Sequence, residues 1–372
     1  MRASGSTLNL AKVLVVTSLP ALLLNPFAGV YVDRWDRKRT MITCDLIRAV
    51  VILSFPWLAL AQSQVPLYIG VFILFAVAAF FVPARLAVIP DLVPADRLAE
   101  ANALFTTSGM IGSTLTFLLG ALLIEWIGAT RSSWVNAAGY LGSAIFIAPI
   151  VRTRRERSSP SASFTLILRE VAEGIKELWR HQETRRVAGL LAILMGGSGA
   201  TVVLGTVLVQ QALRTVTKDL GFLSLWLGIG MLLGTIAYGR WGTKRSRRLI
   251  LGLAFLGCGS AIGFFIGAVL GIKTTASIVF SAGLLGFWVA PVGIITNTMV
   301  HEAHPERLHG RIFSSLGVVL NLALIFSMLT AGWLGERMGR GALLGVIGAG
   351  YAFSGILLLC YTKLRRKENF NE

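Results

Sequence analysis

The sequence predicts an all-α integral membrane protein with eleven transmembrane helices. Of its 372 residues, 55% are hydrophobic and only 14% are charged, whereas roughly a quarter of the residues of a soluble domain are charged. The charges gather in short clusters between long apolar segments, and the pattern of these segments repeats along the chain. This composition excludes a secreted disulfide scaffold, a disordered tail and a typical cytosolic enzyme.

Eleven windows are long and apolar enough to span a membrane. About 18 or more apolar residues in a helix are needed to cross roughly 30 Å of hydrocarbon. The predicted spans are 13–32, 41–61, 66–86, 104–127, 134–151, 187–209, 221–239, 249–270, 276–299, 312–334 and 342–361.

The basic residues predict the orientation of these spans. If the loop after the first span is cytoplasmic, 26 of the 35 Lys and Arg residues lie in cytoplasmic loops and six lie in the loops outside. Such a bias is typical of the positive-inside rule. We therefore expect a multi-pass protein of the inner (cytoplasmic) cell membrane, with its C-terminus in the cytoplasm. The net charge of +17 then follows from topology and does not require a nucleic-acid partner.

The chain also contains an internal repeat. Spans one to five and seven to eleven begin 208 residues apart, or 210 for one pair. The repeat predicts an N-terminal transmembrane half (1–151), a linker (152–186) and a C-terminal half (187–372). The sixth span has no partner, because its counterpart would precede Met1. We therefore expect a twelve-span ancestor whose first half is reduced to five helices here, through a misassigned start, a fragment or a truncated gene.

The linker is predicted to hold a cytoplasmic amphipathic helix. Apolar side chains from Phe164 to Trp179 recur at helical spacing, with charged residues between them. Such a helix would lie on the membrane surface or across the base of the bundle. The plainer interpretation is a linker that happens to be helical.

A charged segment follows the first span. Gly29, Asp33, Arg34, Asp36, Arg37, Lys38 and Arg39 stand at the spacing of a known signature, and segment 29–39 resembles the loop between helices two and three of the major facilitator superfamily. Segments 84–93, 98–102, 173–180 and 310–315 are similar to its macrolide-efflux, enterobactin-exporter and lysophospholipid-transporter subgroup. The positions that carry this similarity include Arg85, Pro90, Asn102, Gly310 and Arg311. The resemblance covers essentially the whole chain.

This resemblance implies a monomeric secondary transporter that works by alternating access, driven by a proton gradient and without a cofactor. Its cargo would be amphiphilic small molecules such as drugs, macrolides or siderophores. The charged segment would gate the cytoplasmic face, with Arg240, Lys244 and Arg245 as its second-half copy. The alternative is that the cluster only enforces topology.

Two charges lie inside the second span. Asp45 and Arg48 are three residues apart and therefore on one helix face. Charges at such positions are costly and usually paired. We favour a local ion pair near the cytoplasmic end, and a proton-coupling carboxylate is the sharper alternative.

Other polar residues far from the charged loops are candidates for a substrate cavity. They are Asn25, Thr201, Asn297, Thr298 and Asn321, with the aromatic residues Phe287 and Trp288. Each could equally bond between helices or face lipid. Some glycines recur at every fourth residue, at 230 and 234 and from 259 to 271. This spacing predicts close helix packing.

Competing functions have weaker support. His301, Glu302 and His304 resemble a zinc-protease motif, but the motif is one residue short and Pro305 follows it. The chain shows no Walker loop or nucleophile elbow, so we expect no enzyme, no catalytic residues and no metal site. Within the same fold, the alternatives are a lysophospholipid flippase and a remnant that transports nothing.

Overall fold

The fold was examined in a computed structural model that describes residues 6–61, 63–150, 164–213, 218–304 and 306–368. The described residues form a bundle of long helices and no strands. The α-helices are α1 (Thr7–Arg34), α2 (Arg37–Leu58), α3 (Val65–Leu92), α4 (Leu98–Ile147), α5 (Phe164–Arg180), α6 (Gln182–Leu213), α7 (Lys218–Ala237), α8 (Arg247–Gly267), α9 (Thr275–Ala303), α10 (Glu306–Arg337) and α11 (Arg340–Glu368). A 3₁₀ turn (Ala95–Arg97) and two π-helical turns (Tyr238–Gly242 and Ala268–Ile272) complete the described elements.

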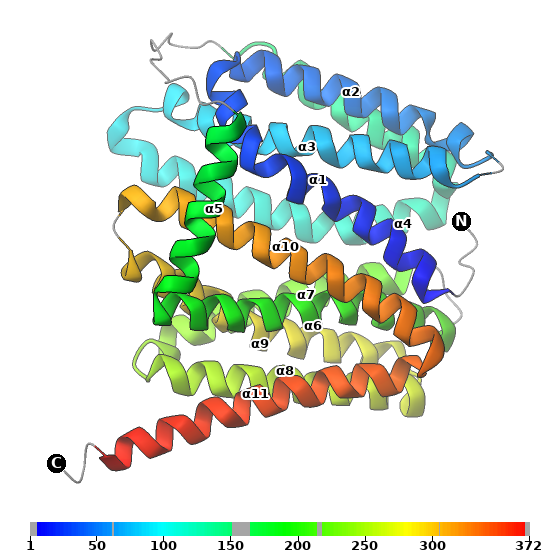
Figure 1. Cartoon of the computed structure of the whole chain (residues 1–372). Helices are drawn as coiled ribbons and strands as arrows, with labels where there is room; N and C mark the ends of the chain where they lie inside the picture. The colour runs from blue at the N-terminus through cyan, green and yellow to red at the C-terminus, as the bar shows by residue number, and fades with distance from the viewer. Residues whose placement is uncertain (1–5, 62, 151–163, 214–217, 305, 369–372) are drawn as a thin grey trace.

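Nine helices among the described residues are long and apolar enough to cross a membrane. The two remaining predicted spans, 104–127 and 134–151, both fall in α4. An unbroken helix of 50 residues would be about 75 Å long. The chain instead folds into two arms at Gly128. The φ of this residue is 80°, a backbone conformation that residues other than glycine rarely adopt. The second arm contacts α2 and lies behind it in Figure 1.

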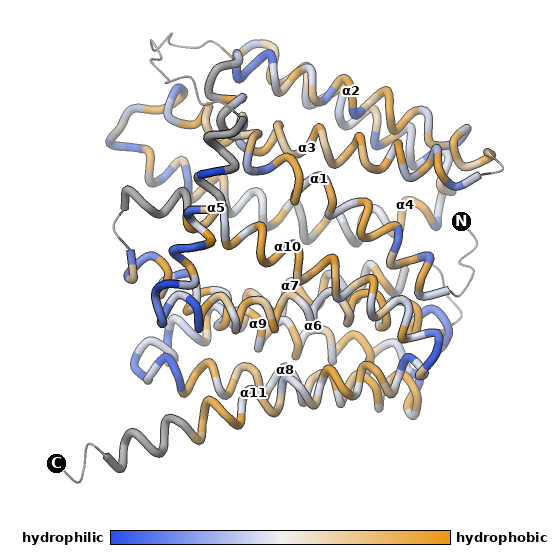
Figure 2. Tube along the Cα trace, in the orientation of Figure 1, coloured by the Kyte–Doolittle hydropathy of each residue, from blue (hydrophilic) through white to orange (hydrophobic). Residues whose placement is uncertain are grey.

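The helices run roughly antiparallel, so their ends gather at two faces (Figure 1). We call the face crossed by α5 the α5 end and the opposite face the distal end. Hydropathy follows this division, because the tube in Figure 2 is largely apolar along the helices and hydrophilic near both faces. Many large apolar side chains are exposed, among them Phe146 at 82% and Phe326 at 70%. An apolar surface of this kind suits a lipid environment.

The largest apolar core lies among α6, α8, α9 and α11. Phe255, Leu204, Ile262, Ile295 and Leu344 are almost completely buried in it. Helices α7 and α9 also pack closely, as do α8 and α11. A methyl group on Gly259 of α8 would lie 2.5 Å from the carbonyl oxygen of Gly348, so the small residue is required there.

Contacts also join α1–α4 to α6–α11. They are made between α1 and α10 and between α4 and α7. Near the distal end, Ala11 packs beside Val203 and Met328 in a small core shared by α1, α6 and α10. These contacts bring the early and late helices together around the site described next.

Candidate functional site

A cavity of 670 Å³ lies between α4 and the helices α6, α7, α8 and α9. Its wall is mostly aliphatic, with residues such as Val202, Leu223, Leu227, Ile262, Leu285 and Val289. Its size and apolar wall fit a drug-sized ligand.

A few hydroxyl groups interrupt the apolar wall. Thr116 of α4, Ser198 and Thr201 of α6 and Tyr351 of α11 all line the cavity. The Tyr351 hydroxyl donates a hydrogen bond of 2.7 Å to the carbonyl of Leu194, which ties α11 to α6. The buried Thr201 Oγ1 has no hydrogen-bond partner among the described residues. A small movement of the Thr201 side chain would be needed to turn this oxygen to a ligand or to water.

Polar contacts join α1 to α10 at the distal end. Ser6 Oγ donates to Glu336 Oε1 at 2.5 Å, and the backbone N–H of Leu8 donates to the same oxygen at 3.3 Å. Thr7 Oγ1 donates to the carbonyl of Gly332 at 3.0 Å. Together they hold the start of α1 against the end of α10.

The charged segment 29–39 comprises the end of α1, a two-residue turn at Trp35 and Asp36, and the start of α2 at the α5 end. Asp36 caps α2, its side chain accepting from the N–H of Arg39 at 2.8 Å. Arg37 reaches α3, where its Nη1 donates to the carbonyl of Ala87 and lies 3.3 Å from Asp91 Oδ2. Lys38 is half-buried and Arg39 is exposed. The surroundings of Gly29 and the side chains of Asp33 and Arg34 lie outside the described structure.

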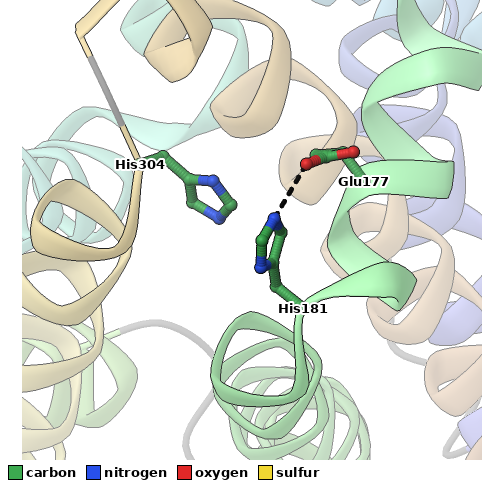
Figure 3. A group of neighbouring side chains, drawn as sticks. All are labelled: Glu177, His181 and His304. Carbon is green, nitrogen blue, oxygen red and sulfur yellow. Dashed lines mark hydrogen bonds and ion pairs between the residues drawn. The ribbon is translucent and has the colours of Figure 1, made fainter.

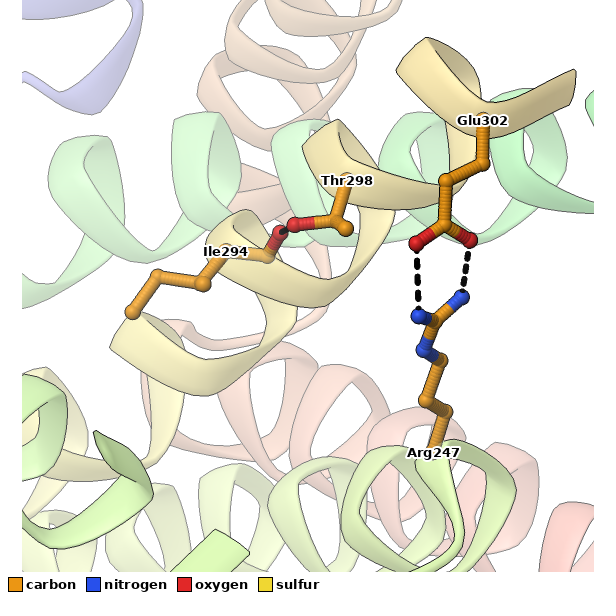
Figure 4. Close-up of polar contacts among 4 residues, drawn as sticks. All are labelled: Arg247, Ile294, Thr298 and Glu302. Atoms are coloured by element: carbon orange, nitrogen blue, oxygen red, sulfur yellow. Dashed lines mark hydrogen bonds and ion pairs between the residues drawn. The ribbon is translucent and has the colours of Figure 1, made fainter. Parts of the chain in front are cut away.

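A second ion pair occupies the matching place among the later helices. Arg247 is the first residue of α8, as Arg37 is of α2, and it pairs with Glu302 near the end of α9. Two hydrogen bonds of 2.5 and 2.8 Å join the guanidinium to both carboxylate oxygens. Figure 4 shows this fork, with Thr298 bonding back to Ile294 one turn earlier.

Sequence reasoning missed both of these pairs. Arg37 and Arg247 are 210 residues apart, close to the repeat, so their equivalence could have been read from the sequence. Their acidic partners could not, because each lies more than 50 positions away along the chain. The predicted second copy consisted of Arg240, Lys244 and Arg245. The structure places these three on the exposed turn before α8.

Asp45 and Arg48 lie buried on α2, with Asp45 Oδ1 3.4 Å from Arg48 Nη1. The guanidinium also stacks on the ring of Phe81, 4.3 Å from its centroid. Both residues line a pocket of 560 Å³ between α2, α3 and α4, together with Arg85. Asp45 Oδ2 and two guanidinium nitrogens of Arg48 are buried without a hydrogen-bond partner among the described residues. A hydroxyl, a carbonyl or a water inside the pocket could form hydrogen bonds with these atoms.

The remaining predicted residues are dispersed. Pro90 and Asn102 are exposed, and the amide of Asn102 bonds to the Leu98 carbonyl of its own helix. Gly310 and Arg311 belong to α10, but their side chains lie outside the described structure.

Of the residues predicted for a substrate cavity, Thr201 lines the 670 Å³ cavity and the others do not. Asn25 lines a smaller pocket of 410 Å³ between α1 and α3. Asn297 is exposed, and the amide of Asn321 donates to the Gly317 carbonyl one turn earlier. Trp288 packs against the large core. Polarity within an apolar helix therefore located one residue of this cavity, Thr201.

Comparison with known proteins decides the family. The sequence model of the Major Facilitator Superfamily matches residues 2–328. The chain belongs to this superfamily. It is a transporter-family protein and not an enzyme. Its fold is similar to that of the nucleoside transporter NupG (D323A mutant), with a TM-score of 0.74 at 13% identity over 95% of this chain and 91% of the other.

Several relatives within the superfamily are exporters by name. The multidrug efflux pump Tap of Mycolicibacterium fortuitum is 24% identical, over 98% of this chain and 90% of the relative. Macrolide efflux protein A of Streptococcus pyogenes is 24% identical, over 96% and 86%. The putative bacilysin exporter BacE of Bacillus subtilis is 26% identical, over 84% and 78%.

Proposed function

We propose that this superfamily member exports amphiphilic small molecules by alternating access, driven by a proton gradient. The observation that carries the proposal is the 670 Å³ cavity, whose aliphatic wall bears only scattered hydroxyls. Such a wall accepts the apolar body of many molecules, while the hydroxyls orient a polar end. The names of the efflux relatives support the same class of cargo.

Alternating access requires two groups of helices that rock against each other. We propose residues 1–151 and 187–372 as these groups, with 152–186 as the linker and with the α5 end in the cytoplasm. The contacts of Ser6 and Thr7 with α10 then close the outer face. The ion pairs Arg37–Asp91 and Arg247–Glu302 support the repeat, since each fixes the cytoplasmic end of a matching helix pair.

Proton coupling requires a carboxylate that is shielded from bulk water. Among the acidic residues whose side chains are described, Asp45 alone is fully buried, at 1% exposure. It faces a pocket that also contains Arg48 and Arg85. We assign Asp45 to the coupling step, because a proton on Asp45 would release Arg48 from its ion pair.

Transport in proteoliposomes tests the proposal. The purified protein is reconstituted, a pH gradient is imposed, and movement of a fluorescent lipophilic cation and of a fluorescent lysophospholipid is followed. We expect the cation to accumulate and nigericin, which collapses the gradient, to stop it. Movement of the lysophospholipid alone would replace the cargo class with the flippase alternative. Movement of neither probe would contradict transport itself.

A further inference from the structure

A compact group of metal-ligating side chains lies at the α5 end, apart from the cavity and the ion pairs. Glu177 belongs to α5, His181 joins α5 to α6, and His304 caps the end of α9. One ligand atom from each lies within 4.8 Å of the other two. Figure 3 shows the three side chains converging from these separate segments.

A small apolar core holds these segments in place. Leu178, the neighbour of Glu177, is 2% exposed and packs with Val187 of α6, Val300 of α9 and Ile312 of α10. The group therefore sits on a packed junction. Burial of its members is graded, since His304 is 6% exposed whereas His181 is open to solvent. An ion could enter from the His181 side.

The group offers the ligand types of a zinc-class ion, and its ligand atoms, which lie within 4.8 Å of one another, must move closer to share one ion. His181 Nε2 lies 2.9 Å from Glu177 Oε1, and the two imidazole rings meet edge-on with centroids 5.1 Å apart. Two imidazoles and one carboxylate form a set that binds Zn²⁺ and leaves a fourth position for water. Small side-chain rotations would bring the three ligand atoms onto one ion.

A neighbouring hydroxyl supplies the orienting contact that metal-bound histidines usually have. His304 Nε2 lies 2.7 Å from Thr184 Oγ1, and both residues are buried. An ion bound at Nδ1 of His304 would leave Nε2–H to donate to that hydroxyl, which fixes the tautomer and the ring.

We propose that Glu177, His181 and His304 bind one zinc-class divalent ion, which clamps the linker helix α5 to the end of α9. The site differs from the protease-like segment 301–304 considered above. The two share His304, but Glu302 of that segment pairs with Arg247 instead, and the other two proposed ligands, Glu177 and His181, lie more than 120 positions earlier in the chain. The ion would restrain the linker on the later helices and stabilise that junction.

Zinc content of the full-length protein tests this proposal directly. Protein without a polyhistidine tag is purified in detergent, stripped with chelator, dialysed against buffered micromolar Zn²⁺ and analysed by mass spectrometry. We expect about one ion per chain, and none after His181→Ala, whose exposed position should not affect folding. Glu177→Gln should weaken binding by roughly 10- to 100-fold or more. The spectrum of the Co²⁺ form should indicate tetrahedral coordination with nitrogen and oxygen ligands.

The matched control is His301→Ala, on the same helix as His304 but outside the group. It should retain the ion, and zinc should raise the unfolding temperature of this variant and the wild type but not of His181→Ala. The proposal is overturned if wild-type protein holds no zinc. It is equally overturned if His181→Ala holds as much zinc as His301→Ala. Neither result depends on transport, so the proposed function would stand.

Discussion

Asp45 and Arg48 are the two charged residues buried on α2. Breaking a buried ion pair by neutralising one partner leaves the other charge uncompensated, which costs about 3 kcal/mol or more. We therefore expect Asp45→Asn to lower the free energy of unfolding by about 3 kcal/mol. Thermal or denaturant unfolding in detergent measures this change.

Asp96→Asn is the control, because Asp96 is exposed and its neutralisation should change stability by less than about 0.5 kcal/mol. Replacing both partners, as Asp45→Leu with Arg48→Met, should recover much of the loss. Equal stability of Asp45→Asn and Asp96→Asn would show that the pair does not stabilise the fold.

Residue spacing anticipates only local pairs. Three-residue spacing on a helix brings Asp45 and Arg48 onto one face, but nothing in the sequence joins Arg37 to Asp91 or His181 to His304. Those contacts depend on which helices become neighbours. Of the hydroxyls in the large cavity, only Thr201 was predicted, because hydroxyls also bond to their own helix, as Thr116 does to the Gly112 carbonyl.

Helix α8 shows which glycines in a periodic row matter for packing. A methyl group on Gly259 would meet the backbone of Gly348 and Ala352 on α11, whereas nothing lies within 4 Å of one on Gly263. Gly259→Leu should therefore destabilise the protein by about 1–3 kcal/mol or more, measured by thermal unfolding.

Gly263→Leu, one turn later on the same helix, is the matched control and should be nearly neutral. Similar losses for both variants would contradict the packing of α8 on α11. The four-residue period predicted a close contact along the whole row. Its outer members, Gly267 and Gly271, also have open space and are exposed, because a row of every fourth residue drifts around the helix, away from the face that α11 covers.

Element boundaries were predictable where hydropathy changes and less so within α4. A loop was expected between spans 104–127 and 134–151. The structure instead turns at Gly128 and continues as helix through the following residues. Hydropathy locates a change of environment, but a single backbone dihedral angle can reverse the chain.

On the scale of the whole molecule, the distal contacts between α1 and α10 must break if the outer face opens. A cysteine pair at Ala11 and Gly332 tests this, because a Cβ on Gly332 would lie 2.7 Å from Cβ of Ala11, so a separation of only about 1 Å brings the pair to the spacing of a disulfide. In a background without the native cysteines, we expect the oxidised pair to block transport and a reductant to restore it.

Each single cysteine variant under the same oxidant is the control and should keep transporting. Undiminished transport by fully cross-linked protein would mean that this end does not open. The repeat predicts two groups of helices and the charge bias predicts their orientation, and both stay predictions. They could not predict which face is closed, because that depends on a conformational equilibrium.

The central claim is that cargo crosses through the 670 Å³ cavity, driven by a proton gradient. Leu223→Trp adds bulk to its wall, whereas Leu232→Trp makes the same change on the exposed face of α7. The most direct measurement compares gradient-driven uptake of the lipophilic cation by these two variants in proteoliposomes. We predict that Leu223→Trp loses most of the uptake and that Leu232→Trp keeps it. Equal uptake by both variants would contradict the assignment of the cavity.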